Sequence, residues 1–129
     1  MNPELCLDNA PLEKLRQIGG NEFVGQMIDL FLQYVPQKLT EARAAAQAGD
    51  WGGVRKAVHP IKSSAANLGA SSMHDLATRI EQLAGEQRGE LISGLLVELE
   101  AAYQSVRARL QQHRNGLTAQ SRSVPDESR

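Results

Sequence analysis

Apolar residues along this chain recur at steps of three and four, and no stretch alternates apolar and polar residues as a half-buried strand would. The longest stripe consists of Val24, Met27, Ile28, Phe31, Val35, Leu39, Ala42 and Ala46. Similar stripes lie within residues 51–68, 73–83 and 92–110. Because such spacing places apolar residues on one face of a helix, each segment predicts an amphipathic helix that must pack against others.

Glycine and aspartate residues mark the expected ends of these helices. A short first helix fits residues 11–18, and Gly19–Gly20 is placed to end it. Gly49 is expected to close the long segment, and Asp50 to cap the helix that follows. That helix should end at Gly69. The connections are therefore short.

Two prolines fall inside predicted helices. A proline has no N–H and its ring clashes with the preceding turn, so Pro36 predicts a kink or a break near Val35. Pro60 removes the hydrogen bond to the Lys56 carbonyl, which typically costs ~3 kcal/mol. For this second site two interpretations stay open: a kink at His59, or an interrupted helix that restarts with Pro60 in its first turn.

Short loops favour antiparallel neighbours. We therefore expect an all-α fold, an up-and-down antiparallel four-helix bundle with one or two additional N-terminal helical segments. Residues 1–113 are expected to form this single domain. Residues 114–129 are polar and lack an apolar period, so we expect a disordered tail.

Composition narrows the function class. The net charge is -1, with 14 basic and 15 acidic residues, which argues against a nucleic-acid partner. The one cysteine, Cys6, provides neither an intramolecular disulfide nor a zinc cluster. The N-terminus lacks a basic region followed by a long apolar run, so we expect no signal peptide and no membrane anchor. A cytoplasmic monomer without a metal site is the expectation.

His59 is the residue that points to chemistry. At roughly 100° per residue it lies about 130° from the apolar stripe of its helix and should face water. Arg55, Ser63 and Ala66 share its outer face, and Lys62 lies at the border of the core. An imidazole with an ordinary pKa of about 6.5 is largely a neutral nucleophile near pH 7. The cations would attract a phosphoryl group, and the small side chains would admit a partner's surface.

Residues 59–70, HPIKSSAANLGA, resemble the motif H-x-L-K-G-S-S-x-x-L-G-A of the histidine-containing phosphotransfer (HPt) domain. The matching positions are His59, Lys62, Ser64, Leu68, Gly69 and Ala70. Residues 19–51, with paired glycines, FL, P-x-x-L and a Gly-Asp-Trp junction, resemble that family's long upstream segment. The departures are Ser63 in place of glycine, Ala65 in place of serine, and Pro60 directly after the histidine.

The resemblance implies a phosphoryl carrier rather than a turnover enzyme. His59 would accept a phosphoryl group from an aspartyl-phosphate of a response-regulator receiver domain and pass it to another receiver, in a relay with a hybrid sensor histidine kinase. Lys62 would steady the phosphoryl charge. The chain would need no cofactor, because Mg²⁺ would come from the receiver, and it carries no G-x-x-x-x-G-K-[ST] nucleotide loop of its own.

Two further residues and two alternatives complete the predictions. Arg79 and Gln82 should lie at the height of His59 on the next helix, where they would donate hydrogen bonds to the groups that surround the imidazole. One alternative is a helical interaction module that binds a receiver or kinase domain without transfer. The other is a hydrolase with His59 as general base, but no acidic residue on that helix face is placed to orient the imidazole.

Overall fold

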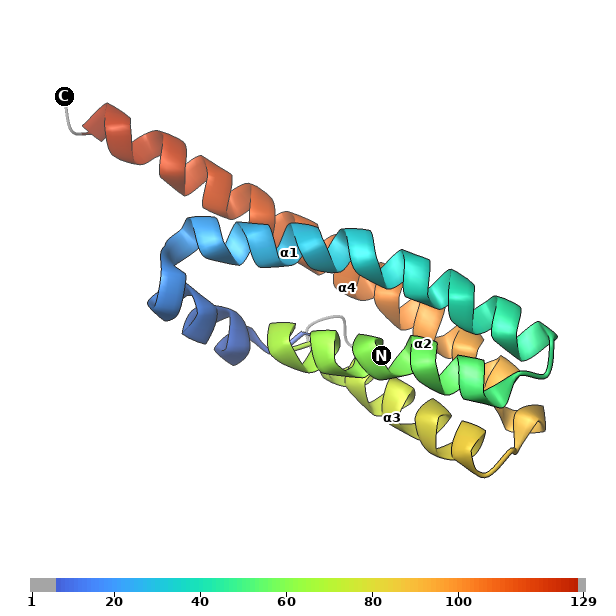
Figure 1. Ribbon diagram of the computed structural model, residues 1–129. Coiled ribbons are helices and arrows are strands. Elements are labelled where there is room, and N and C mark those ends of the chain that lie inside the picture. The colour runs from blue at the N-terminus through green and yellow to red at the C-terminus, as the bar shows by residue number, and fades with distance from the viewer. Residues whose placement is uncertain (1–6, 128–129) are drawn as a thin grey trace.

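The computed structural model describes residues 7–127, and side chains only as far as residue 117. Within that range the helices are α1 (Asn9–Gln47), α2 (Trp51–Leu68), α3 (Ser71–Gly85) and α4 (Gly89–Glu127). They run up and down beside one another (Figure 1), and each packs against its two neighbours to close a ring. The predicted all-α four-helix bundle is confirmed. Cys6 lies outside the described residues.

The additional N-terminal segment is the first part of α1. Gly20 has φ 81° and ψ -178°, a conformation outside the helical region, so α1 bends sharply there. The residues before it fold back across the end of the bundle where α2 meets α3 (Figure 1). The Asp8 N–H donates a 2.7 Å hydrogen bond to the Gly69 carbonyl and fixes this segment. The glycine pair therefore ends the first helix as predicted.

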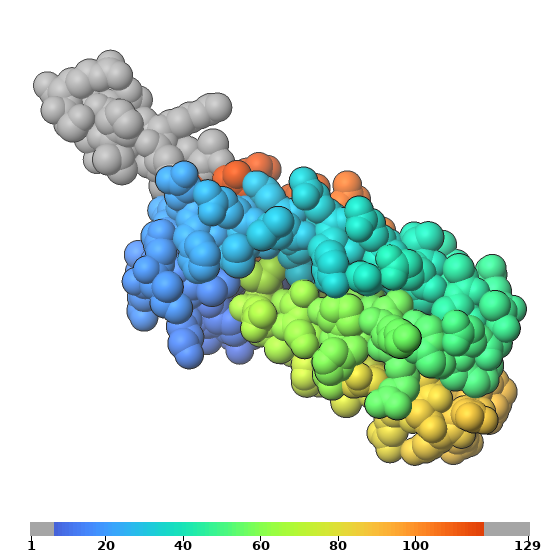
Figure 2. Space-filling model, viewed as in Figure 1, coloured from blue at the N-terminus to red at the C-terminus, as the bar shows by residue number. Residues whose placement is uncertain are grey.

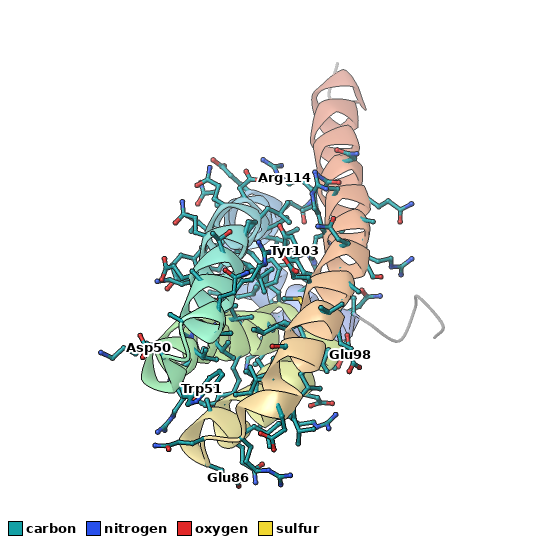
Figure 3. All side chains as sticks on the ribbon, turned by 90° about the vertical axis from the view of Figure 1, so that its right-hand side faces the viewer. Asp50, Trp51, Glu86, Glu98, Tyr103 and Arg114 are labelled. Atoms are coloured by element: carbon teal, nitrogen blue, oxygen red, sulfur yellow. The ribbon has the colours of Figure 1, made fainter. Side chains whose placement is uncertain are left out.

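Pro36 does not break α1, because Gly20 is the residue at which the described helix leaves helical dihedral angles. The proline leaves the Leu32 carbonyl without its intrahelical donor. The Tyr103 hydroxyl of α4 donates to that carbonyl at 3.4 Å, and Tyr103 lies between α4 and α1 (Figure 3). Of the kink or break predicted near Val35, the break is therefore wrong, and a neighbouring helix satisfies the freed acceptor.

The C-terminal tail is also different from the prediction. α4 continues past His113 to Glu127, and its end extends beyond the bundle (Figure 1). Arg114 donates two hydrogen bonds to Asp29, at 3.2 and 3.1 Å, and Leu117 is buried. Residues 114–117 therefore pack against the bundle, because Leu117 extends the apolar stripe of α4 by two turns beyond Leu110.

The turns at both ends of α2 hold it in place. At its start, the Asp50 carboxylate accepts a 2.9 Å hydrogen bond from the Gly53 N–H. Asp50, Trp51 and Glu86 lie at the same end of the bundle (Figure 3), where the Trp51 ring covers Gly89 so closely that a side chain there would overlap it. At its end, Gly69 adopts a left-handed conformation with φ 80°. Both predicted helix ends are confirmed.

Candidate functional site

α2 places His59 on the surface by burying its opposite face. The buried residues of the helix are Val54, Ala57, Val58, Ile61, Ala65 and Leu68. The His59 side chain is 60% exposed, and the outer face of α2 lies open between α1 and α3 (Figure 2). A solvent-facing His59 is what the sequence predicted.

Pro60 does not interrupt α2, which runs as one helix from Trp51 to Leu68. The carbonyl that loses its donor belongs to Lys56, an exposed residue, so water can take the place of the missing N–H. Of the two interpretations left open, the interrupted helix is therefore wrong. His59 lies within one continuous helix.

Glu81 of α3 joins the two residues on which the motif centres. Its Oε2 lies 2.6 Å from His59 Nδ1, and its Oε1 accepts a 2.6 Å hydrogen bond from Lys62 Nζ. The Glu81 side chain is only 17% exposed, whereas that of Lys62 is 26% exposed. The sequence indicated no acidic residue on the His59 face of α2 itself, and the carboxylate that contacts the imidazole comes instead from the neighbouring helix.

The ionisation of Glu81 settles which ring nitrogen of His59 carries the proton. Burial raises the pKa of this carboxyl, but the hydrogen bonds from Lys62 and His59 outweigh it and hold the pKa below the usual range. A carboxylate has acceptor sites only, so Nδ1 must donate its proton to Glu81 Oε2. The lone pair of the neutral ring is then on Nε2, away from Glu81.

Sequence reasoning missed Glu81 and proposed its neighbours Arg79 and Gln82. In the structure both of these side chains are exposed, and Gln82 Nε2 bonds Glu86 at 3.4 Å on its own helix. No hydrogen bond joins either one to His59 within the described part of the chain. The available signal was register: in an antiparallel pair that turns at Ala70, His59 and Glu81 each lie eleven residues from the turn.

The remaining predicted residues border the imidazole. Arg55 precedes His59 by one turn, and its guanidinium lies over Gly85 of α3. Ser63 and Ala66 follow on the same exposed face of α2. Ala66 also lines a groove of about 870 Å³ beside this face whose apolar walls include the exposed Ile18 and Leu30. The helical turn before His59 therefore carries the positive charge of Arg55, and the turns after it carry small side chains.

The described residues hold neither a cluster of metal-binding side chains nor a membrane-spanning helix. No three of their histidine, cysteine, aspartate or glutamate side chains gather as a metal site would require. None of their helices has an apolar stretch of the length needed to span a bilayer.

The comparisons with known proteins agree with this geometry. The family model of the Hpt domain matches residues 26–115. The crystal structure of histidine-containing phosphotransfer protein B (HptB) from Pseudomonas aeruginosa PAO1 is similar, with a TM-score of 0.81 and 25% sequence identity. The match covers 85% of this chain and 95% of that one. The comparison with curated proteins found no match. Since the matched segment contains His59, Lys62 and Glu81 and spans most of the bundle, the chain belongs to the Hpt domain family.

Proposed function

We propose that this protein is a phosphorelay intermediate in which His59 accepts a phosphoryl group from an aspartyl-phosphate of one receiver domain and delivers it to another. Hpt domains work with receiver domains and kinases in two-component phosphorelays. The observation that carries the assignment to His59 is its 2.6 Å contact with Glu81 through Nδ1, on a side chain that is 60% exposed. That contact leaves Nε2 as the nucleophile.

The transfer itself is a displacement at phosphorus. The Nε2 lone pair forms the N–P bond, while the P–O bond to the receiver's aspartate breaks and its electron pair returns to the aspartate carboxylate. The ring becomes an imidazolium that keeps its Nδ1 proton. Glu81, already ionised and hydrogen-bonded to Nδ1, neutralises that positive charge without reorganisation.

Positive charge beside His59 serves the phosphoryl oxygens. Lys62 is one turn away on α2, and its ammonium group is held at Glu81 before transfer. Since the side chain is 26% exposed, the ammonium can turn outward to the phosphoryl group once that group arrives. Arg55 adds a second cation on the preceding turn. Any Mg²⁺ needed is assigned to the receiver partner.

Access to Nε2 depends on the small residues of α2. The receiver must bring its aspartyl-phosphate in line with Nε2, with the reacting atoms about 3–3.5 Å apart. Ser63 and Ala66 are exposed and project little, so they leave room for a protein surface. The alternative of a module that binds without transfer was motivated by Pro60 and Ser63. Because α2 runs through Pro60 as one helix, an interruption at His59 no longer argues for that alternative.

A histidine series tests the proposal. A receiver carrying labelled phosphate on its aspartate is mixed with the wild type, H59Q, H74Q or H113Q. We expect acid-labile label on the wild type and on both controls, and none on H59Q, with all four chains folded by circular dichroism. Label retained on H59Q contradicts the assignment. Binding of the receiver without label on any chain favours the interaction module.

A further inference from the structure

Glu81 contacts Nδ1 of His59, the ring nitrogen that takes no part in the proposed bond to phosphorus. We infer that the Glu81 carboxylate retains the Nδ1 proton while the phosphoryl group is on Nε2, and so keeps phospho-His59 ready to discharge. Glu81 is then a positioning residue that sets how easily the group leaves. This inference rests on the proposed function, because it concerns the phosphorylated state of that site.

The contacts of Glu81 fit a residue that holds the Nδ1 proton better than one that only fills space. The carboxylate is 17% exposed and makes one 2.6 Å contact with each of two partners, Lys62 through Oε1 and His59 through Oε2. When Lys62 turns to the phosphoryl oxygens, its bond to Glu81 is lost and the carboxylate charge acts on Nδ1 alone. Phosphorylation therefore strengthens the hold of Glu81 on the proton.

The other charged groups near His59 and Glu81 are exposed to solvent or bonded elsewhere. On α2, Arg55 and Lys56 precede His59 by one turn and are exposed to solvent. On α3, Arg79 and Glu86 are exposed as well. On α1, the Lys38 ammonium is already bonded to Glu41 at 3.1 Å. Lys62 and His59 are the groups whose charges act on the Glu81 carboxylate, so Glu81 supplies the negative charge at Nδ1.

The chemistry of discharge explains why the proton matters. During transfer onward, the N–P bond breaks and its electron pair returns to Nε2, while the new receiver's carboxylate oxygen bonds to phosphorus. If Nδ1 keeps its proton, the ring leaves as neutral imidazole. If Nδ1 has lost that proton to water, the ring must leave as an anion, which is a far poorer leaving group. The fraction of phospho-His59 protonated at Nδ1 thus limits the discharge rate.

The size of the effect follows from charge and exposure. An opposite charge within ~4–6 Å moves a protonation equilibrium by ~1–3 pH units. Because His59 is 60% exposed, solvent screening places the shift near the lower end, at about one unit. One unit corresponds to about a tenfold change in the protonated fraction on the alkaline side of the midpoint.

The test compares the wild type with E81Q, and uses E86Q as a control on an exposed glutamate of the same surface. The chains are labelled with ¹⁵N-histidine, phosphorylated with phosphoramidate, and titrated by NMR. We expect the midpoint for Nδ1 deprotonation of phospho-His59 to fall by about one pH unit in E81Q and to stay unchanged in E86Q. Discharge to a receiver at pH 8.5 should be about tenfold slower in E81Q.

Glutamine keeps an oxygen that accepts the Nδ1 hydrogen bond, so E81Q removes the charge without removing the orientation of the ring. A structural role alone would leave the midpoint of E81Q unchanged, and that result overturns the inference. The proposed function fails separately: it is contradicted if wild-type His59 takes no phosphoryl group from a phosphorylated receiver. Thermal melting of each variant verifies that the compared chains are folded.

Discussion

Gly69 is the motif residue whose substitution has the most definite cost. It has φ 80°, and a Cβ built on it would overlap the carbonyl oxygen of Asp8. An alanine there must therefore adopt a left-handed conformation and also push away the chain before α1. The Asp8 N–H to Gly69 carbonyl bond of 2.7 Å joins these same two segments. Their separation would release the N-terminal segment from the bundle.

Gly49 supplies the matched control for the size of this effect. It has φ 69°, but no atom lies within 4 Å of the Cβ position. G49A should therefore cost only the left-handed conformation, about 1 kcal/mol. G69A adds the loss of a backbone hydrogen bond, about 1 kcal/mol, and displaced packing of similar size. We expect about 3 kcal/mol for G69A.

Thermal melting followed by circular dichroism measures the difference. For a chain of this length 1 kcal/mol corresponds to about 4 °C in Tm. G49A should melt about 4 °C below the wild type, and G69A about 12 °C below it. Urea denaturation gives the same comparison as free energies of unfolding. Equal losses for the two variants would refute the close approach of Asp8 as the reason for glycine in this motif.

Three further predictions concern single side chains. S63W should slow phosphoryl transfer at least about tenfold by covering the approach to Nε2. Its Tm should be unchanged, because Ser63 is exposed. Unimpaired transfer would contradict the claim that small residues on α2 give the receiver access to His59. Y103F should lower the free energy of unfolding measured in urea by about 1 kcal/mol. The loss should be smaller in a P36A background, because the restored backbone N–H then bonds the Leu32 carbonyl. Equal losses in the two backgrounds would refute the Tyr103 contact. Folding lowers the pKa of the Glu81 carboxyl, so the ionised carboxylate stabilises the fold at pH values above its pKa in the unfolded chain. This stabilisation is lost as pH falls through the pKa of Glu81 in the folded chain. As pH falls below the ordinary range of a glutamate carboxyl, the wild type should therefore lose more stability than E81Q in urea melts, and parallel curves would contradict the pair.

The fold followed from local patterns because each helix carries its own apolar stripe and its own end signals. Val54, Ile61 and Leu68 mark one face by spacing alone, and Gly69 ends the helix through its own backbone conformation. The position of His59 opposite that face needs no knowledge of the partner helices. Such features depend on residues close in sequence, so one chain is enough to predict them.

The missed features depend on contacts between distant segments. The hydrogen bond from Tyr103 to the carbonyl that Pro36 leaves without a donor joins two different helices, so spacing along one helix does not reveal it. Glu81 reaches His59 only through the register of α2 against α3. An error of one residue in that register favours Gln82, whose side chain bonds along its own helix instead. Leu117 lies in a polar context, so its burial becomes evident only once α4 is packed.

The most direct measurement is the identity of the nitrogen that carries the phosphoryl group. The ¹⁵N-labelled protein, phosphorylated by a receiver, is examined by NMR for ¹⁵N–³¹P coupling, with H74Q and H113Q used to assign the ring. The account predicts coupling to Nε2 of His59, with the proton on Nδ1. Phosphorus on Nδ1 of His59, or on either of the other two histidines, would contradict it.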